Sequence, residues 1–112
     1  MTGKTLKQYQ QDIDDWAQTL AKPYWAPLSI YARIAEEVGE LGRVLNHIYG
    51  DKPKKPTEDA QELAEEMADI VFAVMCLANR EGIDLDPAMQ NVIQKAHTRD
   101  SDRFAKKPTL KK

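Results

Sequence analysis

Two long segments of the chain carry apolar residues at steps of three and four positions, and this spacing constrains the fold more than any other feature. In the first segment, residues 28–48, the apolar stripe comprises Ile30, Ile34, Val38, Leu41, Leu45 and Ile48. In the second, which follows Thr57 and closes at Gly82, the stripe comprises Leu63, Met67, Ile70, Val74 and Leu77. Because this period puts apolar side chains on one face of an α-helix, we predict two long amphipathic helices.

Two shorter helices are predicted near the ends of the chain. The sequence TLKQ has the form of a capping box with Thr5 as N-cap, and it opens a helix in which we expect Trp16 to be a core residue. Near the other end, Asp86 is a suitable N-cap and Pro87 suits the first helical position. No segment alternates like a strand, so the expected fold class is all-α. We predict an antiparallel four-helix bundle over residues 1–104, followed by a flexible basic tail at 105–112.

We expect this bundle to be completed by oligomerisation. The apolar run IVFAVMCLA, residues 70–78, leaves no polar face on that part of its helix, which must therefore be surrounded. A chain of 112 residues buries only a modest fraction of its surface when it folds alone. A homodimer or homotetramer would cover the run, and Cys76 within it is expected to be a buried, inert thiol.

Charge and hydropathy exclude several kinds of partner. A formal net charge of −2 gives no reason to expect binding to nucleic acid or to an anionic membrane. The longest apolar run is too short to cross a bilayer, and the N-terminal sequence lacks the apolar core of a signal peptide. We therefore expect a cytoplasmic protein without a membrane or nucleic-acid partner.

Acidic residues repeat at the same place on the two long helices. Residues 36–45, EEVGELGRVL, align with residues 65–74, EEMADIVFAV, at an offset that pairs Glu37 with Glu66 and Glu40 with Asp69. The acids of each helix are three positions apart, so they are neighbours on one face beside the apolar stripe. If the helices pack antiparallel through their stripes, these four carboxylates converge on one pocket.

Electrostatic repulsion limits what such a pocket can be. Two carboxylates about 5 Å apart repel by roughly 3 kcal/mol at an effective dielectric constant near 20, so a cation or strongly raised pKa values are required. The chain has neither a Cys/His cluster for zinc nor the Glu-x-x-His pairs of a di-iron bundle. Oxygen ligands alone favour magnesium or manganese. The alternative is that these acids form a solvated helix face.

The segment EEVGE followed by EMAD resembles the E-E-x-x-E…E-x-x-D signature of MazG-like nucleoside triphosphate pyrophosphohydrolases, within the all-α NTP pyrophosphatase superfamily. The stretches PLSIYARIAEEVGELGRVLNHIYGDKPKKP, VFAVMCLAN and KAHTRDSDRF resemble the short, single-domain bacterial members. The resemblance implies magnesium-dependent hydrolysis between the α and β phosphates, which yields a nucleoside monophosphate and pyrophosphate. It also implies that the metal ligands are Glu37, Glu40, Glu66 and Asp69, while Glu36 binds a further metal ion or orients the attacking water.

The same resemblance implies substrate contacts beyond the acids. Lys95 and Arg99 are four positions apart and lie on one helix face; Arg103 lies one turn further. Lys95 and Arg99 correspond to basic residues that bind phosphate in the family. Together with the glutamates, they are the catalytic candidates. The alternative for these residues is a solvated basic helix end. Further candidates for substrate binding are Trp25, Tyr24 and Tyr31 for base stacking, His47 near the nucleoside, and Lys54 on phosphates across a subunit boundary. A surface histidine and a solvated loop are the alternatives for the last two.

The sequence therefore predicts a Mg²⁺- or Mn²⁺-dependent pyrophosphohydrolase that acts on dNTPs or non-canonical NTPs and cleans the nucleotide pool. Two alternatives stay open. One is a relative with narrow specificity, namely a dUTPase, dCTPase or phosphoribosyl-ATP pyrophosphohydrolase. The other is a helical interaction module that binds divalent ions without catalysis.

Overall fold

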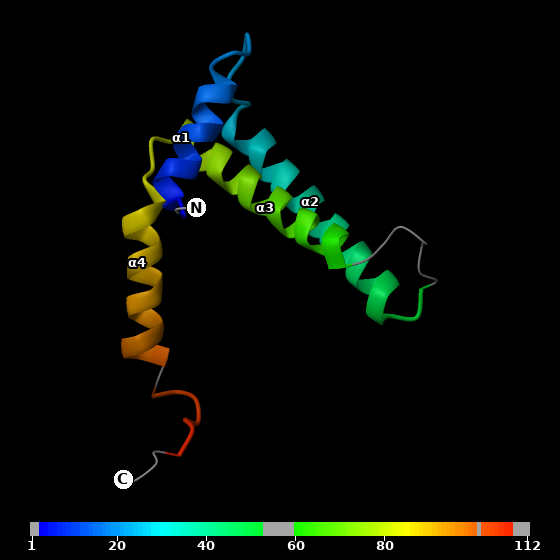
Figure 1. Ribbon diagram of the computed structural model, residues 1–112, viewed down its shortest axis with the longest axis vertical. Coiled ribbons are helices and arrows are strands. Elements are labelled where there is room, and N and C mark those ends of the chain that lie inside the picture. The colour runs from blue at the N-terminus through cyan, green and yellow to red at the C-terminus, as the bar shows by residue number, and fades with distance from the viewer. Residues whose placement is uncertain (1–2, 53–59, 101, 109–112) are drawn as a thin grey trace.

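A computed structural model of the chain describes residues 3–52, 60–100 and 102–108. This part contains four α-helices and no strand, as predicted (Figure 1). The helices are α1 (Leu6–Ala17), α2 (Pro27–Tyr49), α3 (Ala60–Arg80) and α4 (Leu85–Lys95), and α4 continues into a π-helical turn, η1 (Ala96–Asp100).

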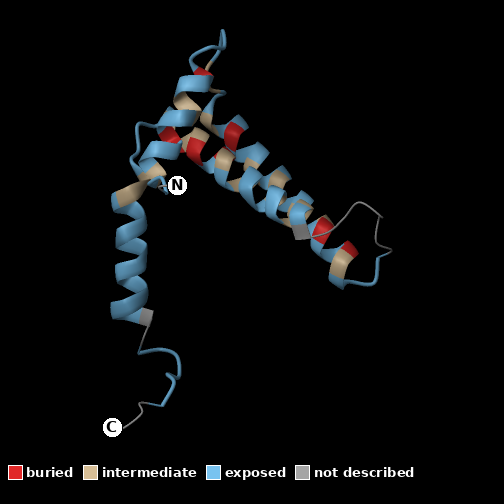
Figure 2. Cartoon of the chain, viewed as in Figure 1, coloured by how far each residue is buried: buried red, intermediate tan, exposed pale blue. Residues whose placement is uncertain are grey.

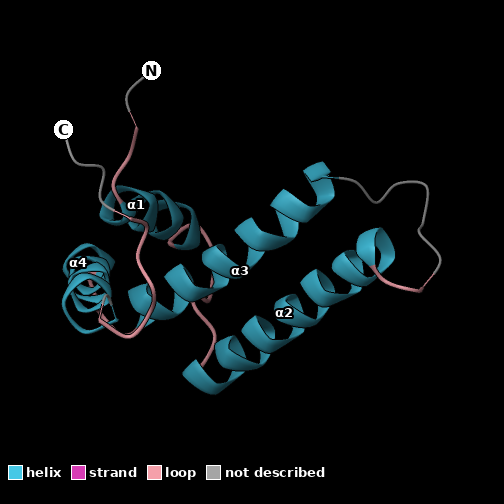
Figure 3. Cartoon of the chain, turned by 90° about the horizontal axis from the view of Figure 1, so that it is seen from below, coloured by secondary structure: helices cyan, strands magenta, loops and turns pink. Residues whose placement is uncertain are grey.

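Helices α2 and α3 form an antiparallel hairpin, and the other two helices gather at one end of it. Helix α1 packs against α3, and α4 packs against α1. Figures 1 and 3 both show α4 leaving this junction in a direction that diverges from the hairpin. The radius of gyration is 18.3 Å, whereas a compact chain of this length has about 13 Å. A single copy is therefore an open, two-armed shape and not a closed bundle.

Capping residues define the beginning of α1 and the end of α3. Thr5 accepts a hydrogen bond from the Gln8 amide at 3.1 Å, and the Gln8 side chain accepts one from the Thr5 amide at 2.7 Å, which confirms the predicted capping box. Gly82 ends α3 in the left-handed conformation, with φ of 68°, which glycine adopts without steric cost. The proposed cap Thr57 lies outside the described residues.

The start of α4 differs from the prediction. Asp84, two residues earlier than expected, is the N-cap and accepts a hydrogen bond from the Asp86 amide at 3.0 Å. Asp86 instead accepts a hydrogen bond from the Leu6 amide of α1 at 3.1 Å. Pro87 therefore falls at the third helical position, where its missing N–H would have had no partner within the helix. Identifying Asp86 as the cap was wrong because that carboxylate serves α1.

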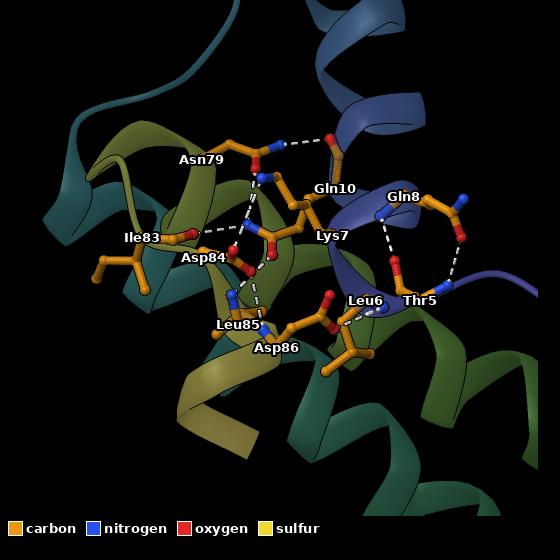
Figure 4. Close-up of polar contacts among 10 residues, drawn as sticks. All are labelled: Thr5, Leu6, Lys7, Gln8, Gln10, Asn79, Ile83, Asp84, Leu85 and Asp86. Carbon is orange, nitrogen blue, oxygen red and sulfur yellow. Dashed lines mark hydrogen bonds and ion pairs between the residues drawn. The ribbon is translucent and has the colours of Figure 1, made fainter. Parts of the chain in front are cut away.

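A buried glutamine joins α1 to the end of α3 and the beginning of α4 (Figure 4). Gln10 donates hydrogen bonds to the Asn79 side chain at 3.0 Å and to the Ile83 carbonyl at 2.8 Å. It accepts one from the Leu85 amide at 3.0 Å, and Asn79 donates one back to the Gln10 carbonyl at 2.9 Å. Because these bonds link three elements, they set the direction in which α4 departs.

The core of the single chain is small, as Figure 2 shows. The α2–α3 hairpin buries Ile30, Val44 and Ala73. Several residues predicted to lie in the buried stripes are instead more than one-third exposed; these are Val38, Leu45, Met67 and Val74. The apolar face of α2 and that of α3 are each wider than the surface that the other helix covers. The contact between the two helices therefore buries only one side of each apolar face.

Two further expectations about the core are corrected. Trp16 is 52% exposed and is not a core residue, because α1 buries the face that carries Gln10 and Ala17, and Trp16 lies about 100° around the helix from Ala17. Cys76 is half-buried and lines a pocket, so it is not fully enclosed.

None of the described helices combines the length and the apolar character that a membrane span requires. In the predicted tail, residues 105–108 are exposed and have no regular structure, and residues 109–112 lie outside the described part.

Candidate active site

A group of three carboxylates lies where the acidic segments of α2 and α3 face each other. One oxygen from each of Glu37, Glu66 and Asp69 lies within 4.8 Å of the others. Glu37 comes from α2, while Glu66 and Asp69 are one turn apart on α3. The two glutamates are half-buried and Asp69 is exposed. We call these three residues the acid group.

The charge of this group is unfavourable without a counter-ion. Partial burial raises the pKa of Glu66, and the neighbouring charges of Asp69, Glu37 and Glu40 raise it further, against a smaller opposing effect of Arg43. A carboxyl group in such surroundings either binds a proton or shares a cation. Three hard oxygen donors at this spacing fit a divalent ion such as Mg²⁺ or Mn²⁺.

The other two predicted acids lie at the edge of the acid group. Glu40, the fourth predicted ligand, is not among the three residues and pairs with Arg43, whose Nε lies 3.1 Å from its Oε2. This pair is substantially exposed, and such surface ion pairs are weak. Glu36 is exposed on α2 directly before Glu37. The chain thus brings three of the four predicted ligands together.

Arg33 links the acid group to an aromatic region, and the sequence analysis missed it. Its Nε lies 3.8 Å from Oε1 of Glu37, one turn later on α2. Its guanidinium group lies 5.7 Å from the centre of the Trp25 ring. The i,i+4 spacing of Arg33 and Glu37 was a detectable signal, but the contact with Trp25 depends on the path of the turn before α2.

A pocket of about 150 Å³ lies near the acid group, where the end of α1 and the turn that precedes α2 meet the beginning of α2 and the second half of α3. Its aromatic lining comprises Trp16, Tyr24, Trp25 and Phe72. The rings of Trp16 and Phe72 meet edge to face, with centroids 6.0 Å apart. Phe72 follows Asp69 by three residues and was also missed by the sequence analysis. We call this cavity the aromatic pocket.

The remaining substrate candidates have different surroundings. Trp25 lines the aromatic pocket, whereas Tyr31 is strongly exposed and does not. His47 is 4% exposed, so its interpretation as a surface histidine was wrong, and it does not line this pocket either. Lys54 lies outside the described residues.

The basic residues of the C-terminal helix are not near the acid group of the same chain. Lys95 ends α4, and Arg99 lies in η1; both belong to the arm that diverges from the hairpin in Figures 1 and 3. Arg103 follows this arm, and its guanidinium group lies 5.7 Å from the centre of the Phe104 ring. The expected phosphate contacts are therefore not assembled within one chain, because α4 packs against α1.

The hairpin and its acid group define a class of protein: an all-α protein whose two central helices present carboxylates for a hard divalent cation. The family model of the MazG nucleotide pyrophosphohydrolase domain matches residues 26–104. The chain belongs to this family, and it is a hydrolase of nucleotide pyrophosphate bonds. Dependence on a divalent metal is general in the family, and the acid group is suited to it.

Individual relatives are similar to the chain over most of its length. The chain is 44% identical over 107 residues to the uncharacterized protein YpjD of Bacillus subtilis (strain 168), covering 96% of both proteins. The crystal structure of YPJD from Bacillus subtilis, described as a candidate pyrophosphatase, is 43% identical with a TM-score of 0.80; the match covers 88% of this chain and 100% of that one. The Bacillus-conserved MazG protein, a nucleotide pyrophosphohydrolase, is 38% identical with a TM-score of 0.76; that match covers 92% and 100%.

Proposed function

We propose that the protein hydrolyses nucleoside triphosphates, either dNTPs or non-canonical NTPs, at the α–β phosphoanhydride bond with Mg²⁺ or Mn²⁺ as cofactor. The products are a nucleoside monophosphate and pyrophosphate, and the role is to clean the cytoplasmic nucleotide pool. The acid group carries the proposal, because three carboxylate oxygens within 4.8 Å of one another repel when they are ionised, and a bound cation relieves that repulsion. A triphosphate is the kind of ligand that such a cation binds.

Each side chain of the site has a task in this proposal. Glu37, Glu66 and Asp69 hold the cation, and Glu40 joins them by exchanging its weak pair with Arg43 for the ion. A bound divalent ion supplies the positive charge that offsets the triphosphate and the charge that develops during hydrolysis. Glu36 orients the attacking water, and Trp25 stacks on the base. Tyr31, His47 and Lys54 are secondary candidates for substrate contacts.

We propose that the functional form is a homodimer or homotetramer. The accessible surface of the chain is 9068 Å², about 2,800 Å² more than a monomeric protein of this mass exposes. Counted over two copies this excess is about 5,600 Å², at the upper end of the total area that obligate interfaces bury. The uncovered apolar faces of the hairpin, with Val38, Leu45, Met67 and Val74, are the surfaces to be buried.

A second copy also accounts for the phosphate contacts. Helix α4 exposes Met89, Val92 and Ile93, so it has an apolar face of its own to cover. Docking α4 onto the hairpin of a neighbouring chain would cover both faces and bring Lys95, Arg99 and Arg103 toward that chain's acid group. These basic side chains would then face a triphosphate bound at the acid group, and their positive charge would complement its negative charge.

A pyrophosphate-release assay with a panel of dNTPs and Mg²⁺ tests the proposal. We expect Asp69→Asn to abolish release, whereas Asp15→Asn, a matched change on the exposed face of α1, retains it. Unchanged turnover in Asp69→Asn would refute the role of the acid group. No activity with any nucleotide, together with retained Mg²⁺ binding, would favour the non-catalytic interaction module.

A further inference from the structure

The aromatic pocket has the size of a single six-membered ring. Its volume is about 150 Å³, and an apolar protein cavity of that size accommodates benzene. The pocket is partly open, so the second ring of a purine would extend beyond the enclosed space. We propose that the pocket favours pyrimidine over purine nucleotides; this inference rests on the proposed function.

The pocket lies at the correct place along the hairpin for the base of a bound nucleotide. On α3, the lining residues Phe72 and Ala73 follow Asp69 by three and four positions; on α2, Arg33 precedes Glu37 by four. A helix rises 1.5 Å per residue, so these lining residues lie about 5 Å further along the helix axes than the acid group. This distance matches the span of a ribose, which leaves the phosphates beside the carboxylates.

Two aromatic side chains at the pocket are unusually exposed for their size. Trp16 is 52% exposed and Trp25 is 54% exposed, although tryptophan is on average a well-buried residue. Ile30 and Ala73, by contrast, are buried at the base of the same pocket. Aromatic faces that border a cavity and are not covered by the chain offer stacking partners for a base.

The hydrogen-bonding groups of the pocket favour acceptors on the base. The Tyr24 hydroxyl donates to Asp14 and accepts from Asn79 at 3.1 Å, so it is already engaged on both sides. Burial and the bond to Asp14 raise the pKa of Tyr24 to about 12, which keeps it protonated. The other polar side chains in the lining are those of Lys22, Arg33 and Cys76.

These three side chains are all donors. The ammonium and guanidinium groups carry only N–H bonds, and burial raises the pKa of the Cys76 thiol, which therefore keeps its proton. Every pyrimidine carries a keto oxygen at position 2, which can accept from these groups. The lining thus suits a pyrimidine base, in addition to the single-ring size of the enclosed space.

Tyr24 is a positioning residue for this selection. Asn79, which holds its hydroxyl, is itself held by Gln10 of α1, as Figure 4 shows. The wall formed by Tyr24 therefore cannot move outward without breaking bonds to both α1 and α3. A rigid wall is what allows a pocket to discriminate by size.

The test compares kcat/KM for dUTP, dTTP, dCTP, dATP and dGTP. We expect the three pyrimidine nucleotides to exceed both purines by about tenfold or more, the ratio that small differences in fit to a pocket produce. Phe72→Ala enlarges the pocket and should raise the purine-to-pyrimidine ratio. Tyr24→Phe should raise KM for dUTP with little change in kcat, whereas the matched change Tyr9→Phe, on α1 and outside the pocket, should alter neither. A purine preference in the wild-type enzyme would overturn the inference.

A binding measurement separates this inference from the proposed function. With EDTA present, dUMP should quench the fluorescence of Trp16 and Trp25 at lower concentration than dAMP, and this readout needs no hydrolysis. If the protein hydrolyses no nucleotide but binds dUMP more tightly than dAMP, the proposed function is refuted and the pocket inference stands. Equal or stronger quenching by dAMP would refute the pocket inference whatever the activity, and whether or not the Phe72 variant folds.

Discussion

Neutralising Glu66 should make the metal-free protein more stable, although it removes a residue of the active site. In the acid group, Glu66 takes part in two of the three repulsive pairs, with Glu37 and with Asp69, over distances of up to 4.8 Å. At 4.8 Å a pair of like charges costs about 3.5 kcal/mol at a dielectric constant of 20 and about 0.9 kcal/mol in water. Asp69 is exposed, so the lower half of that range applies.

The net gain is smaller than the sum of the two pairs, because Glu66→Gln also loses the attraction of Arg43. We expect the variant to be about 1 to 2 kcal/mol more stable than the wild type at pH 8 in EDTA. For a domain of this size, each kcal/mol raises Tm by about 4 °C or more. Glu65→Gln, an exposed neighbour on α3, serves as the matched control and should change stability by less than about 0.5 kcal/mol.

The pH dependence follows from the direction of the pKa shift. The pKa of Glu66 is raised in the folded state above its ordinary value of 4.5, so the folded protein holds this proton more tightly than the unfolded chain. The wild type suffers no penalty below pH 4.5 and loses stability as the pH rises through the raised pKa. The advantage of Glu66→Gln should therefore vanish near pH 4 and be complete at pH 8.

Urea unfolding followed by circular dichroism at a fixed protein concentration measures these differences. Added Mg²⁺ should reverse the order, since the wild type gains about 2.7 kcal/mol at a metal concentration one hundred times Kd and the variant gains less. A variant that is less stable than the wild type in EDTA at pH 8, beside an unchanged Glu65→Gln, would refute the reasoning. An advantage of equal size at pH 4 and pH 8 would refute it as well.

Two further predictions concern the fold. Val44→Ala truncates the largest fully buried side chain and should cost roughly 2 kcal/mol of unfolding free energy in the same assay; a cost below about 0.5 kcal/mol would mean that the hairpin packs differently. Gln10→Leu leaves the Leu85 amide and the Ile83 carbonyl without their side-chain partner, so we expect a loss of about 1 to 3 kcal/mol and faster amide exchange at the start of α4. The exposed neighbour Gln11→Leu is the control, and equal exchange in both variants would contradict the role of Gln10.

Local signals in the sequence were sufficient for the helices and for the pairing of the acids. The capping box at Thr5 and the left-handed glycine at position 82 both lie where they were predicted. The offset between the two acidic segments correctly anticipated that Glu37 would meet Glu66 and Asp69. These features depend on neighbours within a few residues, or on a helical period that two segments share, and both can be read along the chain.

Features that depend on which surfaces meet were decided by the tertiary structure. The period of α2 defines a broad apolar arc, but contact with α3 buries Val44 and leaves Val38 exposed. Asp86 has the form of an N-cap, yet it bonds to α1 and Asp84 takes its place. The local preference of Asp86 for the cap position does not decide the outcome, because its carboxylate binds the Leu6 amide, which is far away in the sequence.

The candidate site divides in the same way. The sequence by itself determined the acids, their spacing and the family to which they belong, because those residues are adjacent on regular helices. Only the tertiary structure decided that Trp16, Trp25 and Phe72 surround one pocket near Asp69, and that α4 carries Lys95 away from the acid group of its own chain. The physical reason is that a helical period specifies the face of each residue, whereas the angle between helices is set by turns, buried hydrogen bonds and packing between segments far apart in the chain.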